Sequence, residues 1–320
     1  MGSWTRGELE AAAAVVRAVL PPTPAIVWPL LAQRCGAEVV VKHENHLPTG
    51  AFKVRGGILY AHELRARDPG VRTLIAATRG NHGQSVAYAA RRMGLAARIV
   101  VPHGNSASKN AAMRAWGATL IEHGRDFQDA LEHARTLARD PSLHFVPSFH
   151  PTLVRGVASW ALELLGEAGP LDLLYVPIGL GSSICGAIAA RDALGLRTAI
   201  VGVVAEQAPC YALSFARGEP VATDSADTVA DGLAVRVPDP DALATIRRGV
   251  ERVVTVREAE IRAAIRHYFT DTHQVAEGAG AVGLAALLRD RDAARGRRVG
   301  LVLTGGNIDR ELYAEILREA

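Results

Sequence analysis

The chain has 320 residues, of which 49% are hydrophobic and 22% charged, and 36 Lys and Arg against 33 Asp and Glu give a formal net charge of +3. This length fits two packed lobes better than one small core, and the composition is that of a globular protein, which excludes a disordered or collagen-like chain. Charges of both signs are spread along the chain without a basic block, which argues against nucleic acid or an acidic membrane surface as a partner.

Short apolar runs alternate with longer stretches of helical spacing through most of the chain. Buried strands of a parallel sheet read as continuous apolar runs, so this alternation predicts an α/β fold with parallel-rich twisted sheets flanked by helices. We predict strands at Glu38–Lys42, Thr73–Ala77, Arg98–Val101, Thr119–Ile121, Leu171–Ile178, Ala199–Val204, Arg252–Val256 and Val299–Leu303. We predict helices at Phe52–Arg67, Gly83–Arg92, Ala107–Trp116, Asp126–Arg139, Ile184–Leu194, Glu258–Thr270 and Ile308–Glu319, and an irregular surface segment at Pro209–Pro240.

Cysteine usage and hydropathy bear on where the protein works. Cys35, Cys185 and Cys210 are odd in number and far apart, which favours reduced thiols in the cytoplasm. No apolar stretch approaches the roughly 18 residues of a membrane span, and the N-terminal run MGSWTRGELEAAAAVV has no secretory cleavage pattern. These features predict a cytoplasmic protein without a membrane partner.

Lysine is rare in this sequence, so chemistry that needs an amine has only Lys42, Lys53 and Lys109 as candidates. Lys53 follows the turn segment PTG, and Thr49 is predicted to cap a helix that begins near Phe52. Lys53 then lies in the first helical turn, where the helix dipole disfavours a cation and lowers the pKa of the amine. Schiff-base chemistry requires such a neutral amine. The alternative is a solvated surface lysine.

Glycine and small polar residues also follow three other predicted strands, in TRGNHGQS (Thr78–Ser85), PIGLGSSICG (Pro177–Gly186) and TGGN (Thr304–Asn307). Ligands of open α/β sheets bind beyond the carboxyl ends of strands, and free amides at helix starts bind anions. We therefore predict an anion site at the first segment and a phosphate cradle at Gly179–Ser182. A dinucleotide fingerprint is the alternative for GLGSSI, although Ile184 stands where its third glycine belongs.

The ordered segments resemble those of the fold-type II pyridoxal-phosphate enzymes, specifically the serine/threonine dehydratase and serine racemase group. KHENHLPTGAFKVRGG is similar to the lysine motif of that family, GNHGQ to its substrate loop, GLGSS to its phosphate loop and TGGN to its cofactor-nitrogen motif. TVADGLAV (Thr228–Val235) and VAEGAGAVG (Val275–Gly283) resemble two further family segments. The resemblance implies a two-lobed fold like that of the tryptophan synthase β chain. It also implies a large cofactor-binding domain at residues 1–71 and 148–320, a small substrate-side domain at residues 72–147, and a homodimer.

The resemblance further implies pyridoxal 5'-phosphate as cofactor and a role for each site residue. Lys53 is the catalytic residue, which forms a Schiff base with the cofactor and later moves the Cα proton of the substrate. The other cofactor-binding residues are Phe52 against the ring, Asn81 at the 3-hydroxyl oxygen, the amides of Gly179, Leu180, Gly181 and Ser182 at the phosphate, Gly232 and Glu277 at the other ring edge, and Thr304 at the pyridine nitrogen. The substrate carboxylate is received by Thr78, Arg79, Gly80, Asn81 and His82. We expect no metal, because the run EQAPCYALS offers Glu206 without a second acid.

The implied reaction is a β-elimination that converts a β-hydroxy-α-amino acid into a 2-oxo acid and ammonia, with threonine, serine, 3-hydroxyaspartate and phenylserine as candidate substrates. The neutral hydroxyl of Thr304 favours elimination over transamination, because it cannot hold a proton on the pyridine nitrogen. Arg79 stands where racemases of the family carry a catalytic serine, and arginine does not give up its proton near neutral pH. Arg79 either faces the substrate or pairs with a surface acid. The alternative function is that of a racemase or a β-replacement enzyme. An NAD-dependent dehydrogenase and a non-catalytic binding protein are more remote alternatives.

Overall fold

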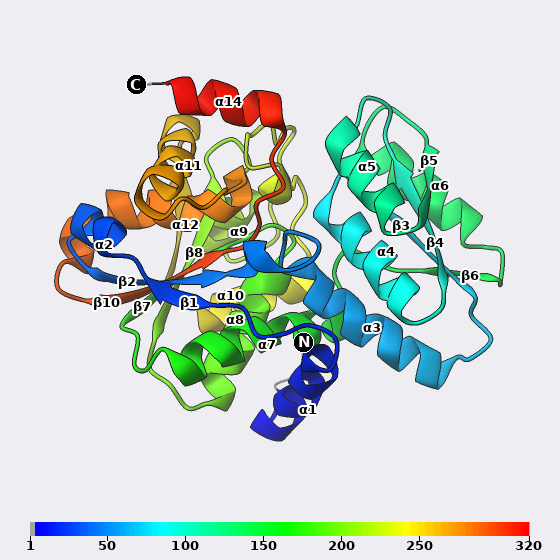
Figure 1. The fold of residues 1–320 in the computed structure, drawn as a ribbon, viewed down its shortest axis with the longest axis horizontal. Coiled ribbons are helices and arrows are strands. Elements are labelled where there is room, and N and C mark those ends of the chain that lie inside the picture. Colours follow the sequence, from blue (N-terminus) through cyan, green and yellow to red (C-terminus); the bar gives the residue numbers. More distant parts are fainter. Residues whose placement is uncertain (1–3, 320) are drawn as a thin grey trace.

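The computed structural model describes residues 4–319 and contains two separate sheets (Figure 1). The larger sheet has six strands, and all neighbouring pairs are parallel except the edge strand β1, which is antiparallel to β2. Its order is β1 (Ala25–Val27), β2 (Glu38–His43), β10 (Arg298–Leu303), β7 (Leu173–Pro177), β8 (Ala199–Ala205) and β9 (Arg252–Val256). Strands from both halves of the chain therefore lie side by side in this sheet.

The smaller sheet has four parallel strands, in the order β5 (Ala118–Glu122), β4 (Ala96–Val101), β3 (Thr73–Ala77) and β6 (Leu143–Phe145). Its strands fall inside the small domain predicted at residues 72–147, and the strands of the larger sheet fall outside it. The exact domain boundaries stay a prediction. All eight predicted strands are present, whereas β1 and β6 were not predicted.

Helices cover both faces of the larger sheet, as the α/β prediction requires (Figure 1). Alternate residues of β2 point to opposite faces, so Val39 and Val41 pack in one core and Val40 packs in the other. The first core includes side chains of α2 (Pro29–Cys35), α11 (Glu258–Thr272) and α12 (Gly278–Arg289). The second includes side chains of α1 (Arg6–Arg17), α7 (Pro151–Glu167), α8 (Ser182–Ala193) and α10 (Pro240–Gly249).

The smaller sheet is also covered on both faces. Side chains of α4 (Asn81–Arg92) and α5 (Ala107–Ala115) share one core with Ile99, and α6 (Phe127–Leu137) packs on the opposite face against Val100. Helix α3 (Lys53–Arg67) packs against α4 on one side and α7 on the other, so it lies between the two lobes (Figure 1). The start of α3 is therefore placed where both lobes meet.

Two features complete the fold. The segment Pro209–Pro240 is less irregular than predicted, because it begins with helix α9 (Cys210–Arg217) and contains a short 3-10 turn, η2 (Asp231–Leu233). The remaining helices are the short α13 (Arg291–Ala294) and α14 (Arg310–Arg318), which matches the predicted last helix. Among residues 4–319, no helix combines the length and apolarity needed to cross a membrane.

Candidate active site

The lysine segment and the TGGN segment meet through backbone hydrogen bonds, although about 250 residues separate them. The N–H of Phe52 donates to the carbonyl of Thr304 at 3.0 Å, and the N–H of Gly306 donates to the carbonyl of Gly50 at 2.9 Å. Asn307 Nδ2 adds a bond of 2.8 Å to the carbonyl of Thr49. The start of α3 is thereby fixed to the loop that follows β10.

Asn81 joins its own segment, GNHG, to two others. Its Nδ2 donates to Oε1 of Glu277 at 2.7 Å, and its Oδ1 accepts from Nδ2 of Asn307 at 2.8 Å. The GNHG, TGGN and VAEGAG segments thus share one polar cluster. Asn307 was not among the predicted site residues, although it ends the predicted site segment TGGN.

The glycine-rich loop after β7 packs closely against the TVADG segment. A Cβ on Gly179 would lie 2.4 Å from the carbonyl oxygen of Gly232, so only glycine fits there without a backbone shift. Gly181 adopts the left-handed conformation (φ 102°) and caps α8. The first amides of α8 have no acceptor within the helix, and the buried Ser183 Oγ has no hydrogen-bond partner among the described residues. Two kinds of donor are therefore free for an anion.

Leu180, Ser182 and Thr304 are each held in place by neighbouring elements. The carbonyl of Leu180 accepts from Tyr211 Oη at 3.1 Å, which anchors the loop to α9. Ser182 is the first residue of α8 and is buried. The Thr304 side chain is buried directly beyond the end of β10.

Lys53 is the first residue of α3, so its predicted place in the first helical turn is confirmed. The predicted cap by Thr49 is wrong: Thr49 Oγ1 donates to the carbonyl of Ala51 at 3.2 Å, and Phe52 occupies the N-cap position without a side-chain cap. Burial lowers the pKa of the Lys53 ammonium, against the opposing charge of Glu277. The direction agrees with the prediction, but the largest cause is loss of solvent and not the helix dipole.

Lys53 differs from the other two lysines in its partners. Lys42 is buried and bonds Glu163 Oε2 at 2.7 Å, and Lys109 bonds Asp231 Oδ2 at 2.7 Å. Within residues 4–319, Lys53 Nζ makes no hydrogen bond or ion pair and lies 5.2 Å from the centroid of the Phe52 ring. It is therefore the lysine whose amine is available for chemistry.

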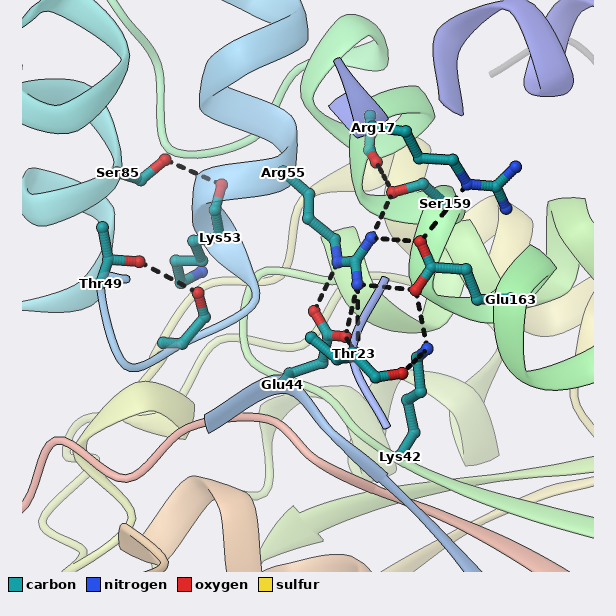
Figure 2. A network of polar contacts seen from close by, with 12 residues as sticks. Arg17, Thr23, Lys42, Glu44, Thr49, Lys53, Arg55, Ser85, Ser159 and Glu163 are labelled. Atoms are coloured by element: carbon teal, nitrogen blue, oxygen red, sulfur yellow. Dashed lines mark hydrogen bonds and ion pairs between the residues drawn. The ribbon is translucent and has the colours of Figure 1, made fainter. Parts of the chain in front are cut away.

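A buried charge network fixes the helix turn that carries Lys53 (Figure 2). Arg55, two residues further along α3, donates from Nε to Glu44 Oε2 at 2.6 Å and from Nη1 to Glu163 Oε1 at 2.8 Å. Since Lys42 also bonds Glu163, the network joins α3 to β2, the following 3-10 turn η1 (Glu44–His46) and α7. Lys42, Glu44, Arg55 and Glu163 are fully buried, and their four charges sum to zero. Arg17, which is 45% exposed, adds an ion pair to Glu163 Oε1 at 3.7 Å (Figure 2).

The loop between β3 and α4 presents backbone donors. Thr78 Oγ1 accepts from the N–H of Gly80 at 3.0 Å, and the first amides of α4, at Asn81 and His82, lack acceptors within the helix. The buried imidazole of His82 lies 3.5 Å from the carbonyl of Val146. Burial lowers the pKa of His82 to about 4, so its ring is neutral at pH 7.

The side chain of Arg79 is 57% exposed. Its Nε lies 3.6 Å from Oδ1 of Asp231, the same carboxylate that Lys109 holds. Of the two roles that the sequence left open, pairing with an acid is therefore observed. Asp231 and Lys109 were not predicted as site residues.

Glu277 supplies a pH-dependent test of this site. Burial raises the pKa of its carboxyl from 4.5 to about 7, so the folded chain favours the protonated form. A carboxyl whose pKa is higher in the folded state than in the unfolded state lowers the free energy of unfolding. This loss grows as the pH rises from the pKa of the unfolded state to the pKa of the folded state. In the apoprotein, Glu277→Gln should therefore raise the free energy of unfolding relative to wild type by up to about 3 kcal/mol at pH 8, with little gain at pH 4. Urea unfolding at both pH values measures this, and equal differences would contradict the assignment.

Comparison with known proteins covers nearly the whole chain. Residues 16–305 match the family model described as "Pyridoxal-phosphate dependent enzyme". An L-threo-3-hydroxyaspartate ammonia-lyase of a Pseudomonas species is 36% identical, over 92% of this chain and 93% of the relative. An L-threonine ammonia-lyase of Thermotoga maritima is 34% identical, over 91% of this chain and 72% of the relative. The solved structure of threonine deaminase isoform 2 from Solanum lycopersicum is 26% identical and superposes with a TM-score of 0.90, over 99% of this chain and 95% of the other.

Proposed function

We propose, since this chain belongs to the pyridoxal-phosphate-dependent enzyme family, that it is an ammonia-lyase converting a β-hydroxy-α-amino acid into a 2-oxo acid and ammonia. The observation that carries the proposal is the available amine of Lys53 where the motif segments meet, since the other two lysines are held in ion pairs. Relatives named for hydroxyaspartate and threonine support a β-hydroxy-α-amino acid as the substrate class.

The residues present fit the cofactor. The amides that begin α8, together with Gly179, Leu180, Gly181 and Ser182, would hold its phosphate, and the unpartnered Oγ of Ser183 lies in the same turn. We assign the face and edges of the ring to Phe52, Asn81, Gly232 and Glu277, and the pyridine nitrogen to Thr304. Lys53 would hold the aldehyde carbon.

The phosphate loop provides a direct binding test. Gly179→Ala should raise the dissociation constant of pyridoxal phosphate at least about tenfold, because the added Cβ would lie 2.4 Å from the Gly232 carbonyl and force the loop to move. Titration of the apoprotein with the cofactor measures the constant. Gly166→Ala is the control, since a Cβ there meets no atom within 4 Å, and equal affinity of both variants would contradict the assignment.

Lys53 is assigned the proton transfer. Bound pyridoxal phosphate supplies an aldehyde that condenses with amines and an electron-withdrawing ring that stabilises negative charge at the adjacent carbon. The lowered pKa of Lys53 leaves a larger share of neutral amine, which can take the Cα proton of the substrate. Its place on a helix turn locked by the Arg55 network limits the directions from which Nζ can approach.

The substrate carboxylate is assigned to the start of α4. Free amides at Asn81 and His82 and the positive end of the helix dipole suit an anion, and Thr78 holds Gly80 in place. The hydroxyl of Thr304 is neutral, so no carboxylate holds a proton at the position we assign to the pyridine nitrogen. This supports elimination over transamination.

A racemase on the same scaffold is disfavoured by Arg79. Racemisation needs a second group that exchanges a proton with Cα, and the guanidinium of Arg79 stays charged near neutral pH and faces Asp231 at 3.6 Å. The match to the pyridoxal-phosphate family argues against the NAD-dependent dehydrogenase. In addition, the position of the third glycine of a dinucleotide fingerprint is occupied by Ile184, which is fully buried in the core.

Ammonia release from a panel of amino acids is the decisive experiment. The purified holoenzyme is expected to release ammonia and a 2-oxo acid from at least one of threonine, serine, 3-hydroxyaspartate and phenylserine. A D-amino acid as the main product would indicate a racemase, and a product that carries an added nucleophile would indicate β-replacement. No reaction with any member of the panel would overturn the lyase proposal and favour a binding protein.

The proposal also covers the location, the metal requirement and the oligomeric state of the protein. We assign a cytoplasmic location, supported by three buried free cysteines, and a reaction without a metal. We also assign a homodimer, supported by the exposed apolar side chains of Val27 and Leu30 at the edge of the larger sheet. Sedimentation of the purified protein tests the dimer.

A further inference from the structure

Three charged side chains from different parts of the chain meet beside the proposed site. Lys109 Nζ lies 2.7 Å from Asp231 Oδ2, and Arg79 Nε lies 3.6 Å from Asp231 Oδ1. The two cations belong to the lobe of the smaller sheet, whereas Asp231 belongs to the lobe of the larger sheet. One carboxylate therefore holds two cations across the boundary between the lobes, each through a different oxygen.

This cluster adjoins both anion-binding loops. Arg79 directly precedes Gly80, and a Cβ on Gly80 would lie 3.0 Å from Cδ of Lys109, so the stem of Lys109 covers the loop assigned to the substrate carboxylate. Asp231 directly precedes Gly232, which packs against Gly179 of the phosphate loop. The cluster thus borders both loops that we assign to ligand anions.

The two cations of the cluster differ in how far their charges are compensated. Lys109 bonds Asp231 at 2.7 Å, and the charges of Glu277 and Asp309 also stabilise its cationic form. The hydrogen-bond partners of those two carboxylates, Asn81 and Ser106, are neutral and leave their negative charges in place. Arg79 has the longer contact, 3.6 Å, to the Asp231 carboxylate that Lys109 already bonds. A carboxylate brought by a ligand would therefore compensate the charge of Arg79 more than that of Lys109.

Arg79 is the cation that can change partner at low cost. Its contact with Asp231 at 3.6 Å is longer than a hydrogen bond, and an exposed ion pair of this kind adds little to stability. A guanidinium binds a carboxylate best through two parallel hydrogen bonds, a geometry that the present contact does not use. Asp231 therefore leaves hydrogen-bond donors of the Arg79 guanidinium available for another carboxylate.

We propose that Arg79 and Lys109 bind the side-chain carboxylate of an acidic substrate, and that Asp231 is an internal carboxylate which occupies these cations until the substrate arrives. The inference rests on the proposed function and narrows its substrate class to β-hydroxy-α-amino acids with a second carboxylate. Asp231 then sets the affinity, because the substrate carboxylate has to share or displace it. Neutral substrates gain nothing from the pair.

The test uses two ligands that lack a β-hydroxyl and so cannot undergo the elimination. L-Aspartate and L-asparagine have nearly the same shape and differ in the charge of the side chain. Their dissociation constants for the holoenzyme are measured by calorimetry. Wild type is expected to bind aspartate at least about tenfold more tightly, which corresponds to about 1.4 kcal/mol.

Variants of the cluster should move this preference in opposite directions. Arg79→Gln and Lys109→Gln should each reduce it toward unity, while Asp231→Asn should increase it, because the competing carboxylate is gone. Arg125→Gln is the matched control: this arginine of the same lobe is 95% exposed, pairs with Asp129, and should keep the wild-type preference. An unchanged cofactor absorbance spectrum checks that each variant is folded and loaded.

Equal binding of aspartate and asparagine by wild type would overturn the inference, as would an unchanged preference in both Arg79→Gln and Lys109→Gln. Tighter binding of the cationic 2,4-diaminobutyrate, whose side-chain amine is on Cγ and not a β-leaving group, than of aspartate would also overturn it, because Asp231 would then be the ligand. Ammonia release separates the two proposals. If ammonia is released but wild type does not prefer aspartate, the lyase proposal stands and the acidic-substrate site is wrong. If wild type prefers aspartate but releases ammonia from no amino acid, the binding site stands and the lyase proposal is wrong.

Discussion

Replacing Lys53 by alanine is expected to lower ammonia release at least about a thousandfold, because the chain then lacks both the amine that holds the cofactor and the base that takes the Cα proton. Lys42 and Lys109 cannot substitute for it, since each is held in an ion pair at 2.7 Å. Steady-state assays with the best substrate of the panel measure the loss. Borohydride reduction of wild type followed by peptide mapping should place the cofactor on Lys53.

The apoprotein of the same variant serves as the folding control. Lys53 Nζ makes no hydrogen bond or ion pair among the described residues, so its removal should not lower the unfolding midpoint. A label on Lys42 or Lys109, or wild-type ammonia release by the variant, would show that the assigned amine is wrong.

The second large effect is expected at Glu163, in the buried charge network that joins α3 to α7. Glu163→Ala should lower the free energy of unfolding by about 3–5 kcal/mol at neutral pH, because the fully buried cations Arg55 and Lys42 would lose their shared carboxylate. Urea unfolding of the apoprotein measures this. Glu10→Ala is the matched control, since Glu10 is 54% exposed and pairs with the exposed Arg6, and its replacement should change stability by no more than about 1 kcal/mol.

The same carboxyl gives the stability a pH dependence. Burial alone would raise the pKa of Glu163, but the hydrogen bonds and charges of Arg55 and Lys42 outweigh it and hold the pKa below its ordinary value. The stabilisation is therefore complete above the ordinary pKa of a glutamate and is lost as pH falls through the lowered pKa of the folded state. A Glu163→Ala penalty below about 1 kcal/mol at neutral pH would contradict the network.

Much of the fold could be predicted because parallel strands buried on both faces leave a strong local signal. The run of β7, for example, is apolar throughout and bounded by Asp172 and Gly179, so the sequence marks it clearly. β1 and β6 have only three residues each, and they are strands because a neighbouring strand pairs with them. No local pattern carries that information.

The residues of the site likewise fall into those that local sequence identifies and those that depend on distant parts of the chain. Lys53 and the glycine-rich loop could be predicted because the residues that identify them are adjacent in the sequence. The Thr49 cap was wrong because Asn307, from the other end of the chain, bonds the carbonyl of Thr49 and helps shape the turn. The pairing of Lys109 with Asp231 spans 122 residues and depends on how the lobes meet, so the sequence offered only the segment TVADGLAV as a hint.

The place of β10 in the larger sheet has a consequence for how the protein is made on the ribosome. β10 lies between β2 and β7, yet it is synthesised after both of them. The four strands of the smaller sheet can pair as soon as β6 has emerged, whereas β2 and β7 keep open edges until residue 303 is added. Unpaired strand edges are templates for aggregation, so nascent chains of intermediate length are the species that most need chaperones.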